Sequence, residues 1–261
     1  MIRKFALFCL CCCSPAAAWA QSGIVAPRAG CVRDRAGTLR TVFGMAGTFL
    51  PGQAVRTEVV SAACSEQLAV AKTAGALEVR DASMRLLGRW AAPAGPARFA
   101  FSRCGGAVYV YFPETGGLTY YETNRGLRRI PLPNAFGGEA LAIAAPDAQH
   151  LSAVVRGRRG LRLVRVLIPR TLVEQDLPLE DIAGPMLLGR DGTLVYTEAE
   201  EVVIRKPNQA ERRLALPAQA AAIEQMGEDL AAIALVNRAA PAALRWQEGR
   251  EQVLRVPEAA E

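Results

Sequence analysis

Short apolar runs alternate with polar turns along this chain, and the pattern returns about every 40 residues. A proline closes each unit, with successive steps of 40, 45, 39 and 40 residues between Pro93, Pro133, Pro178, Pro217 and Pro257. A second column, the first residue of the apolar run that follows a turn, contains Leu68, Val108, Leu151, Leu194 and Leu230. Two columns that stay in register through five units predict a repeat fold.

The second unit shows what one repeat contains. Its apolar runs are short and are bounded by turn residues, which is typical of strands. We predict strands over 97–102, 108–112, 118–122 and 127–132. Alanine, glutamate and glutamine are good helix formers, so 218–225 or 224–236 has the composition of a helix. The repeat nevertheless predicts strands in that region.

Three segments resemble the turn-and-strand signatures of bacterial secreted β-propellers, the WD40-like or YVTN-like proteins. They are Gly-Arg-Asp-Gly-Thr-Leu-Val-Tyr at 189–196, Ala-Pro-Asp-Ala-Gln-His-Leu at 145–151 and Tyr-Phe-Pro-Glu-Thr-Gly-Gly-Leu at 111–118. The likeness covers most of the chain beyond residue 20 and implies blades without implying a substrate. The Gly-His and Trp-Asp pair of strict WD40 repeats is absent, and the first two units have cysteine-containing turns at Cys64 and Cys104.

The repeat and the resemblance together predict an all-β fold, a β-propeller of about five four-stranded blades in a single domain over 21–261. The blades are expected at roughly 56–96, 97–138, 139–183, 184–219 and 220–258. Ahead of them, 30–44 predicts a two-stranded hairpin that resembles the outer strands of one more blade. This hairpin would be either a thin sixth blade or an added edge that covers an open strand.

The first 20 residues have the pattern of a cleaved signal peptide. Arg3 and Lys4 give a positive start, 5–13 is an apolar core, and Ala18-Trp19-Ala20 is a small-x-small cleavage site. A lipoprotein anchor is the alternative, but no cysteine here follows the Leu-small-small triplet that lipidation prefers. We therefore expect an exported protein, periplasmic or extracellular, with no transmembrane segment after cleavage.

Three cysteines remain after that cleavage. Cys64 and Cys104 occupy the same column of adjacent units, so a disulfide between them is one prediction. Cys31 bonded to either of them is a second, and three small buried thiols are a third.

The net charge of +6 is carried largely by arginine, and the densest run lies at one turn of the third unit. Its members include Arg156, Arg158, Arg159 and Arg162. The run is either a solvated hairpin tip or a tip that binds anionic groups, since guanidinium suits phosphate and carboxylate. Aromatic residues do not interleave with it, so nucleic acid is not the expected partner.

Tyr109 and Tyr111 lie on one face of their predicted strand because side chains alternate along a strand. They would either pack between blades or face a ligand.

Most catalytic arrangements lack their residues. The chain has one histidine, His150, and no phosphate-binding loop, so we predict neither a metal site nor another cofactor. Two carboxylates could still converge as in glycoside hydrolases; the candidates are Glu114, Glu122, Asp147, Asp191 and Glu228. Our first hypothesis is a monomeric, non-catalytic propeller that binds a protein, peptide or glycan. The alternative is a propeller hydrolase or lyase with acidic residues at its axis.

Overall fold

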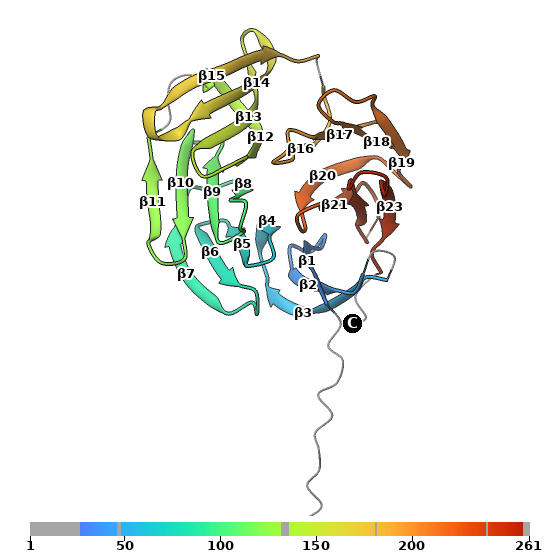
Figure 1. The fold of residues 1–261 in the computed structure, drawn as a ribbon. Helices are drawn as coiled ribbons and strands as arrows, with labels where there is room; N and C mark the ends of the chain where they lie inside the picture. The colour runs from blue at the N-terminus through green and yellow to red at the C-terminus, as the bar shows by residue number, and fades with distance from the viewer. Residues whose placement is uncertain (1–26, 46–47, 132–135, 181, 239, 258–261) are drawn as a thin grey trace, which may run out of the picture.

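The protein is a six-bladed β-propeller, which confirms the all-β prediction. The computed structural model describes residues 27–45, 48–131, 136–180, 182–238 and 240–257. In that part of the chain six antiparallel sheets stand around one axis (Figure 1). The predicted signal peptide at 1–20 lies outside the described residues.

Five blades have four strands each and blade 1 has three. In chain order the strands of blades 1 to 3 are β1 (Arg28–Arg33), β2 (Leu39–Phe43), β3 (Leu50–Arg56); β4 (Val59–Cys64), β5 (Leu68–Thr73), β6 (Ala76–Asp81), β7 (Leu86–Ala91); β8 (Arg98–Phe101), β9 (Ala107–Phe112), β10 (Gly117–Glu122) and β11 (Gly126–Ile130). Those of blades 4 to 6 are β12 (Gly138–Ala144), β13 (His150–Gly157), β14 (Gly160–Leu167), β15 (Leu172–Pro178); β16 (Met186–Leu188), β17 (Leu194–Glu198), β18 (Glu201–Arg205), β19 (Arg212–Ala215); β20 (Ala220–Gln225), β21 (Leu230–Leu235), β22 (Ala242–Arg245) and β23 (Gln252–Arg255). A short 3-10 helix, Ile168–Arg170, links β14 to β15.

The core lies between blades and not within them. Six clusters of buried apolar side chains fill the six interfaces between adjacent blades. Each sheet is therefore covered on both faces, so all six residues of β5 and all six of β9 are buried. This explains why the second strand of each unit has a continuous apolar run instead of an alternating one.

Aspartates of the repeat shape the turns that follow the innermost strands. The carboxylate of Asp191 accepts hydrogen bonds from the Thr193 N–H at 2.9 Å and the Thr193 hydroxyl at 2.7 Å. Gly192, between them, has φ of +87°, a conformation that suits glycine. Asp147 accepts the N–H groups of Gln149 and His150 in the same way. The aspartate in the repeat is thus a turn-forming residue.

Blade 1 contains more than the predicted hairpin. β1 and β2 correspond to that hairpin, and β3 adds a third strand. Cys31 of β1 lies against Cys64, at the end of β4, whereas Gly37 just beyond β1 pairs with Val59, at the start of β4. β1 therefore runs opposite to β4, and among the residues that the structure describes blade 1 has no counterpart of the innermost strand of the other blades.

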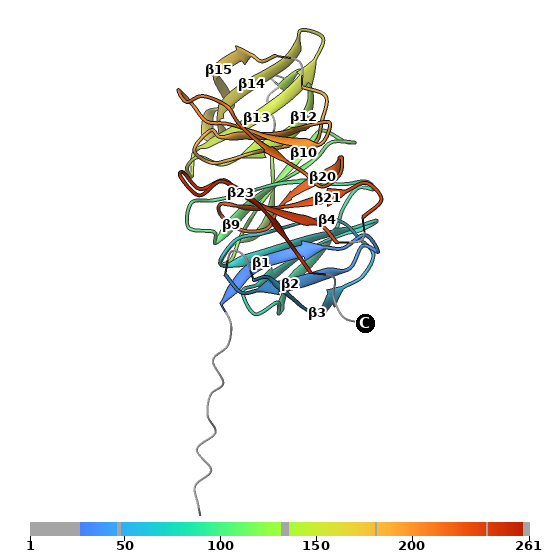
Figure 2. The ribbon, with the colours of Figure 1, turned by 90° about the vertical axis from the view of Figure 1, so that its right-hand side faces the viewer.

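Within the described residues, the ring closes without a strand exchanged between the two ends of the chain. β4 and β20 lie side by side at the axis. Blade 1 lies farther from the axis than these two strands, between blades 2 and 6 (Figures 1 and 2). The end of β20 covers the free edge of β1: the Cys31 N–H donates to the Met226 carbonyl at 3.3 Å. A Cβ on Gly30 would lie 1.7 Å from that carbonyl oxygen, so this approach requires glycine.

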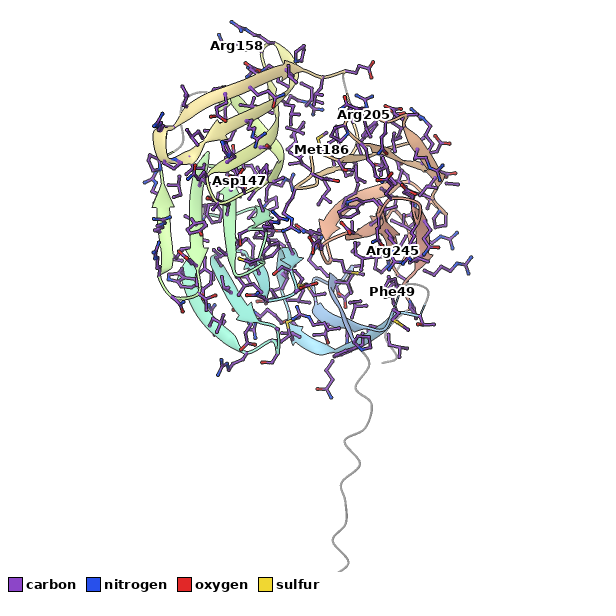
Figure 3. The ribbon with its side chains drawn as sticks, in the orientation of Figure 1. Phe49, Asp147, Arg158, Met186, Arg205 and Arg245 are labelled. Carbon is purple, nitrogen blue, oxygen red and sulfur yellow. A yellow bond between two sulfur atoms is a disulfide. The ribbon has the colours of Figure 1, made fainter. Side chains whose placement is uncertain are left out.

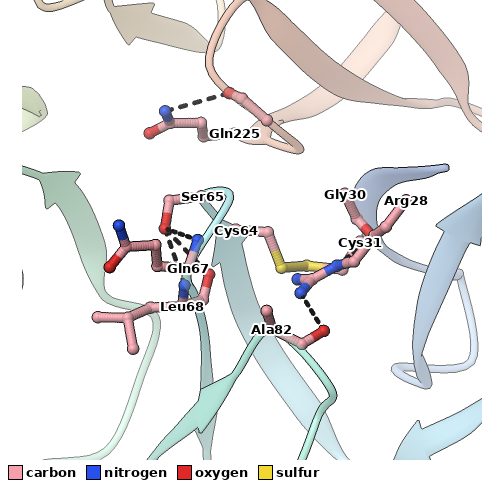
Figure 4. Close-up of a disulfide and its surroundings, with 10 residues drawn as sticks. Arg28, Gly30, Cys31, Cys64, Ser65, Gln67, Leu68, Ala82 and Gln225 are labelled. Atoms are coloured by element: carbon pink, nitrogen blue, oxygen red, sulfur yellow. Dashed lines mark hydrogen bonds between the residues drawn. A yellow bond between two sulfur atoms is a disulfide. The ribbon is translucent and has the colours of Figure 1, made fainter. Parts of the chain in front are cut away.

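A disulfide joins Cys31 to Cys64, with their Cα atoms 5.8 Å apart (Figure 4). The predicted bridge between Cys64 and Cys104 is therefore wrong, and Cys104 is an exposed free thiol. The reason is the antiparallel course of β1, which brings Cys31 to the end of β4, while Cys104 lies beyond the end of β8. The disulfide ties blade 1 to blade 2.

Candidate functional site: the central channel and the loop face above it

In the described part of the chain, five strands line the central channel, because blade 1 has no innermost strand there. Three consecutive residues at each innermost strand line a cavity of about 50 Å³. The segments are 61–63, 97–99, 141–143, 186–188 and 223–225. Figure 3 shows Met186 near the middle of the ring.

The charged side chains that line this cavity come from blades 3 and 6. The carboxylate of Glu224, on β20, accepts hydrogen bonds from the Nε of Arg33 at 3.0 and 3.3 Å. The Glu224 side chain is 18% exposed. Burial raises its pKa, although the Arg33 charge acts in the opposite direction.

Arg98, the first residue of β8, is the second charged group of the cavity wall. Its Nε is buried and has no hydrogen-bond partner within the described part of the chain. The Arg98 charge acts on the Glu224 carboxyl, but Arg33 already pairs with that carboxyl. Arg33 is not among the lining residues, but when it is counted, two guanidinium groups stand against the single Glu224 carboxylate, which is an excess of one positive charge.

The turns that follow the innermost strands meet on one end of the ring, which we call the loop face: 65–67, 102–106, 145–149, 189–193 and 226–229. Arg190 of blade 5 donates to the carbonyls of Ser102 at 3.3 Å and Arg103 at 2.7 Å, both in blade 3. It also pairs with Glu228 of blade 6. Because blades 3 and 5 are not neighbours, the Arg190 side chain crosses the channel mouth.

Cys104 lies beside the Arg190 side chain on the loop face. Its sulfur is 3.4 Å from the Ser102 hydroxyl oxygen. Hydrogen bonds from Ser102 and from the Gly106 N–H, with the nearby Arg190 charge, lower the pKa of the thiol.

His150, the first residue of β13, lies between two carboxylates of blade 4. Its Nδ1 is 2.8 Å from Asp147 and its Nε2 is 3.0 Å from Glu174. Partial burial opposes ionisation of Asp147, but hydrogen bonds from Gln149 and His150 hold its pKa below the usual range. No group of three His, Cys, Asp or Glu side chains in the described residues is arranged to hold a metal ion.

The predicted arginine tip lies far from the channel. Figure 3 shows Arg158 at the outer rim of the ring, and Arg159 beside it is also exposed. Arg156 donates to the Ile182 carbonyl at 2.7 Å, and Arg162 pairs with Asp176 at 2.6 Å. Two of the four arginines are thus held by their own protein, and the other two face solvent.

Tyr109 and Tyr111 do not face a ligand, because each is 3% exposed in the core between blades 3 and 4. Burial raises the pKa of Tyr109 to about 12. Tyr111 packs edge-on against Phe136.

The five candidate carboxylates do not gather in the cavity, since none of them is among its lining residues. Asp147 and Asp191 shape turns, and Glu228 pairs with Arg190. Arg98, Glu224 and Arg190 are not among the site residues predicted from the sequence. Two of them could have been found from the sequence, because Arg98 and Glu224 are charged residues within innermost strands.

Solved structures share this fold at low sequence identity. A chain of the nidogen/laminin complex superposes with a TM-score of 0.60 at 10% identity, over 87% of this chain and 93% of that one. TolB from Acinetobacter baumannii gives 0.58 at 15% identity, over 91% of this chain and 63% of TolB. At such identities the likeness shows the propeller fold alone.

No family model matches the sequence, and no curated protein does. None of the helices in the described residues is long and apolar enough to cross a membrane.

Proposed function

We propose that this protein is an exported, non-catalytic propeller that binds a protein, peptide or glycan at its loop face and in the channel beneath it. The observation that carries the proposal is Arg98, whose buried Nε has no hydrogen-bond partner in the described residues, in a channel whose mouth is crossed by Arg190. Polar groups from several blades converge at this mouth, which is where a partner could contact many of them at once.

The hydrolase alternative needs two carboxylates that face each other across a substrate. Glu224 is the one carboxylate among the residues that line the cavity, and it is already paired with Arg33. This arrangement favours recognition of a ligand over acid–base catalysis.

Export is supported by the cysteines. The Cys31–Cys64 bridge is of the kind that persists in oxidising compartments, such as the periplasm or the cell exterior. The signal-peptide pattern at 1–20 is consistent with the same location.

The experiment is affinity capture with purified protein as bait against cell-envelope extract. One variant makes the loop face more negative, Arg103→Glu with Gln67→Glu, at two exposed side chains. Its matched control changes the rim, Arg158→Glu with Arg159→Glu. We expect a partner that the wild type recovers to be lost at least tenfold with the loop-face variant and retained with the rim variant.

Loss with the rim variant alone would place binding at the arginine tip instead. Retention of the partner by both variants would overturn the loop face as the binding surface. Circular dichroism of both variants confirms that they are folded.

A further inference from the structure

The cavity wall is divided into a polar and an apolar half. Its polar side chains, Ser61, Arg98, Glu224 and Gln225, come from blades 2, 3 and 6. Blades 4 and 5 contribute only apolar residues, namely Leu141, Ala142, Ile143, Met186, Leu187 and Leu188. A ligand that fits both halves therefore has one polar end and one apolar end.

The polar groups of this wall differ in how far they are already engaged. Ser61 accepts the Ala97 N–H at 2.9 Å, and Gln225 donates to the Gly227 carbonyl at 3.2 Å. Glu224 is held by Arg33. Arg98 is the exception, because its buried Nε has no partner in the described residues. A half-buried guanidinium is costly when the nearby carboxylate, here Glu224, is already paired with another arginine, so an anion that pairs with Arg98 gains free energy.

The charge and size of the cavity define which anion fits. The excess is a single positive charge, and Glu224 is nearby, which disfavours a dianion such as phosphate. A cavity of about 50 Å³ accepts a small group and not a whole cofactor, for which pockets are several times larger.

We infer that the central cavity binds a carboxylate carried on a short apolar group, with the carboxylate on Arg98 and the apolar part against blades 4 and 5. This inference rests on the proposed binding function and names the ligand chemistry of that site. The same chemistry occurs in a free short-chain acid and in the C-terminus of a peptide that ends in an apolar residue.

The test is ligand-observed NMR titration of the full protein with four probes: butanoate, butanamide, acetyl-Ala-Val with a free C-terminus, and the same peptide amidated. We expect each carboxylate to bind at least tenfold more tightly than its amide. Arg98→Gln should weaken carboxylate binding roughly 10- to 100-fold, the range for a lost charged hydrogen bond. Arg129→Gln, an exposed arginine on the outer strand of the same blade, should change nothing.

Arg98→Lys keeps the charge and should retain part of the binding, which separates loss of charge from loss of folding. Binding of the peptide acid alone would support the inference with a chain terminus as the source, and binding of butanoate would extend it to free acids. Equal binding of acid and amide, or carboxylate binding that Arg98→Gln leaves unchanged, would overturn it.

The two proposals fail separately. If the carboxylate probes do not bind but the captured partner still depends on the loop-face residues, the binding function stands and the cavity inference falls.

Discussion

Glu78 lies between blades 1 and 2 with its side chain only 3% exposed, and three arginines surround it. Arg80 approaches its carboxylate at 2.8 Å, Arg56 at 3.2 Å and Arg89 at 3.7 Å. Arg56 belongs to β3 and the other two to blade 2, so one buried carboxylate joins two blades. Buried charges persist in proteins when they are paired in this way.

Glu78→Gln removes the negative charge and leaves the arginines facing one another. We expect a loss of about 3–5 kcal/mol in the free energy of unfolding, as for other broken buried pairs. Urea denaturation measures it, and Glu66→Gln at an exposed glutamate should stay within about 0.5 kcal/mol of the wild type. Equal stability of the two variants would show that the Glu78 charge does not stabilise the fold by pairing with these arginines.

Glu251 gives a pH-dependent prediction. Lys206 of blade 5 donates to this carboxylate of blade 6 at 2.8 Å, and the two side chains are 10% and 6% exposed. That hydrogen bond holds the pKa of Glu251 below its ordinary value of 4.5. The unfolded chain therefore binds a proton more readily, so the stabilisation is present above about pH 4.5 and is lost as the pH falls through the lower, folded value.

Glu251→Gln should be less stable than the wild type at pH 7 by about 1.5–3 kcal/mol, the range for a charged hydrogen bond. Urea midpoints at pH 7 and pH 3 test this, and the gap between the two proteins should narrow at the lower pH. A gap that is the same at both values would contradict the assigned role of the ionised carboxylate.

At the scale of single elements, the strands of the repeat could be predicted because local signals agree there. The turn of Asp191 and Gly192 and the closing prolines bound the apolar runs. Even the Ala- and Glu-rich segments form β20 and β21, because a helix would break the interface with blade 5. β3 was missed because it contains Pro51 and Gly52 and buries none of its residues fully, so it has no apolar pattern.

The disulfide compensates for what blade 1 lacks. Without an innermost strand, this blade has fewer backbone hydrogen bonds, and Cys31–Cys64 closes a loop with a sequence separation of 33 residues. Chain-entropy arguments assign such a loop about 3–4 kcal/mol.

The double variant Cys31→Ala with Cys64→Ala should lose about that free energy, and amide hydrogen exchange should increase most in β1 and β2. Cys104→Ala is the matched control and should leave both measurements unchanged. Uniform acceleration of exchange across all blades would contradict a role confined to blade 1.

At the scale of the whole molecule, the channel could not be predicted from the sequence. Arg98 and Glu224 are 126 residues apart by subtraction and lie in different units, so only closure of the ring brings them to one cavity. Arg190 likewise reaches blade 3 across the axis. A repeat describes what its units share, whereas this site consists of residues that the units do not share.

Ring closure between blades 1 and 6 depends on packed side chains as well as on the backbone hydrogen bond from Cys31 to Met226. The seam between blades 1 and 6 is a cluster that includes Val42, Phe49, Met226 and Val256. Phe49 is 1% exposed there. Because the described part of the chain places no shared strand across this seam, it is the interface at which we expect the ring to open first.

Phe49→Ala should cost about 3–5 kcal/mol through the cavity it leaves. Phe101→Ala, in the core between blades 2 and 3, is a matched truncation of comparable burial and should cost a similar amount. The two should differ in where the structure loosens. Hydrogen exchange should increase locally in β1, β2 and β23 for Phe49→Ala, whereas Phe101→Ala should lower protection across the ring. Matching exchange patterns in the two variants would mean that the ring unfolds as one unit and that the seam is no weaker than any other interface.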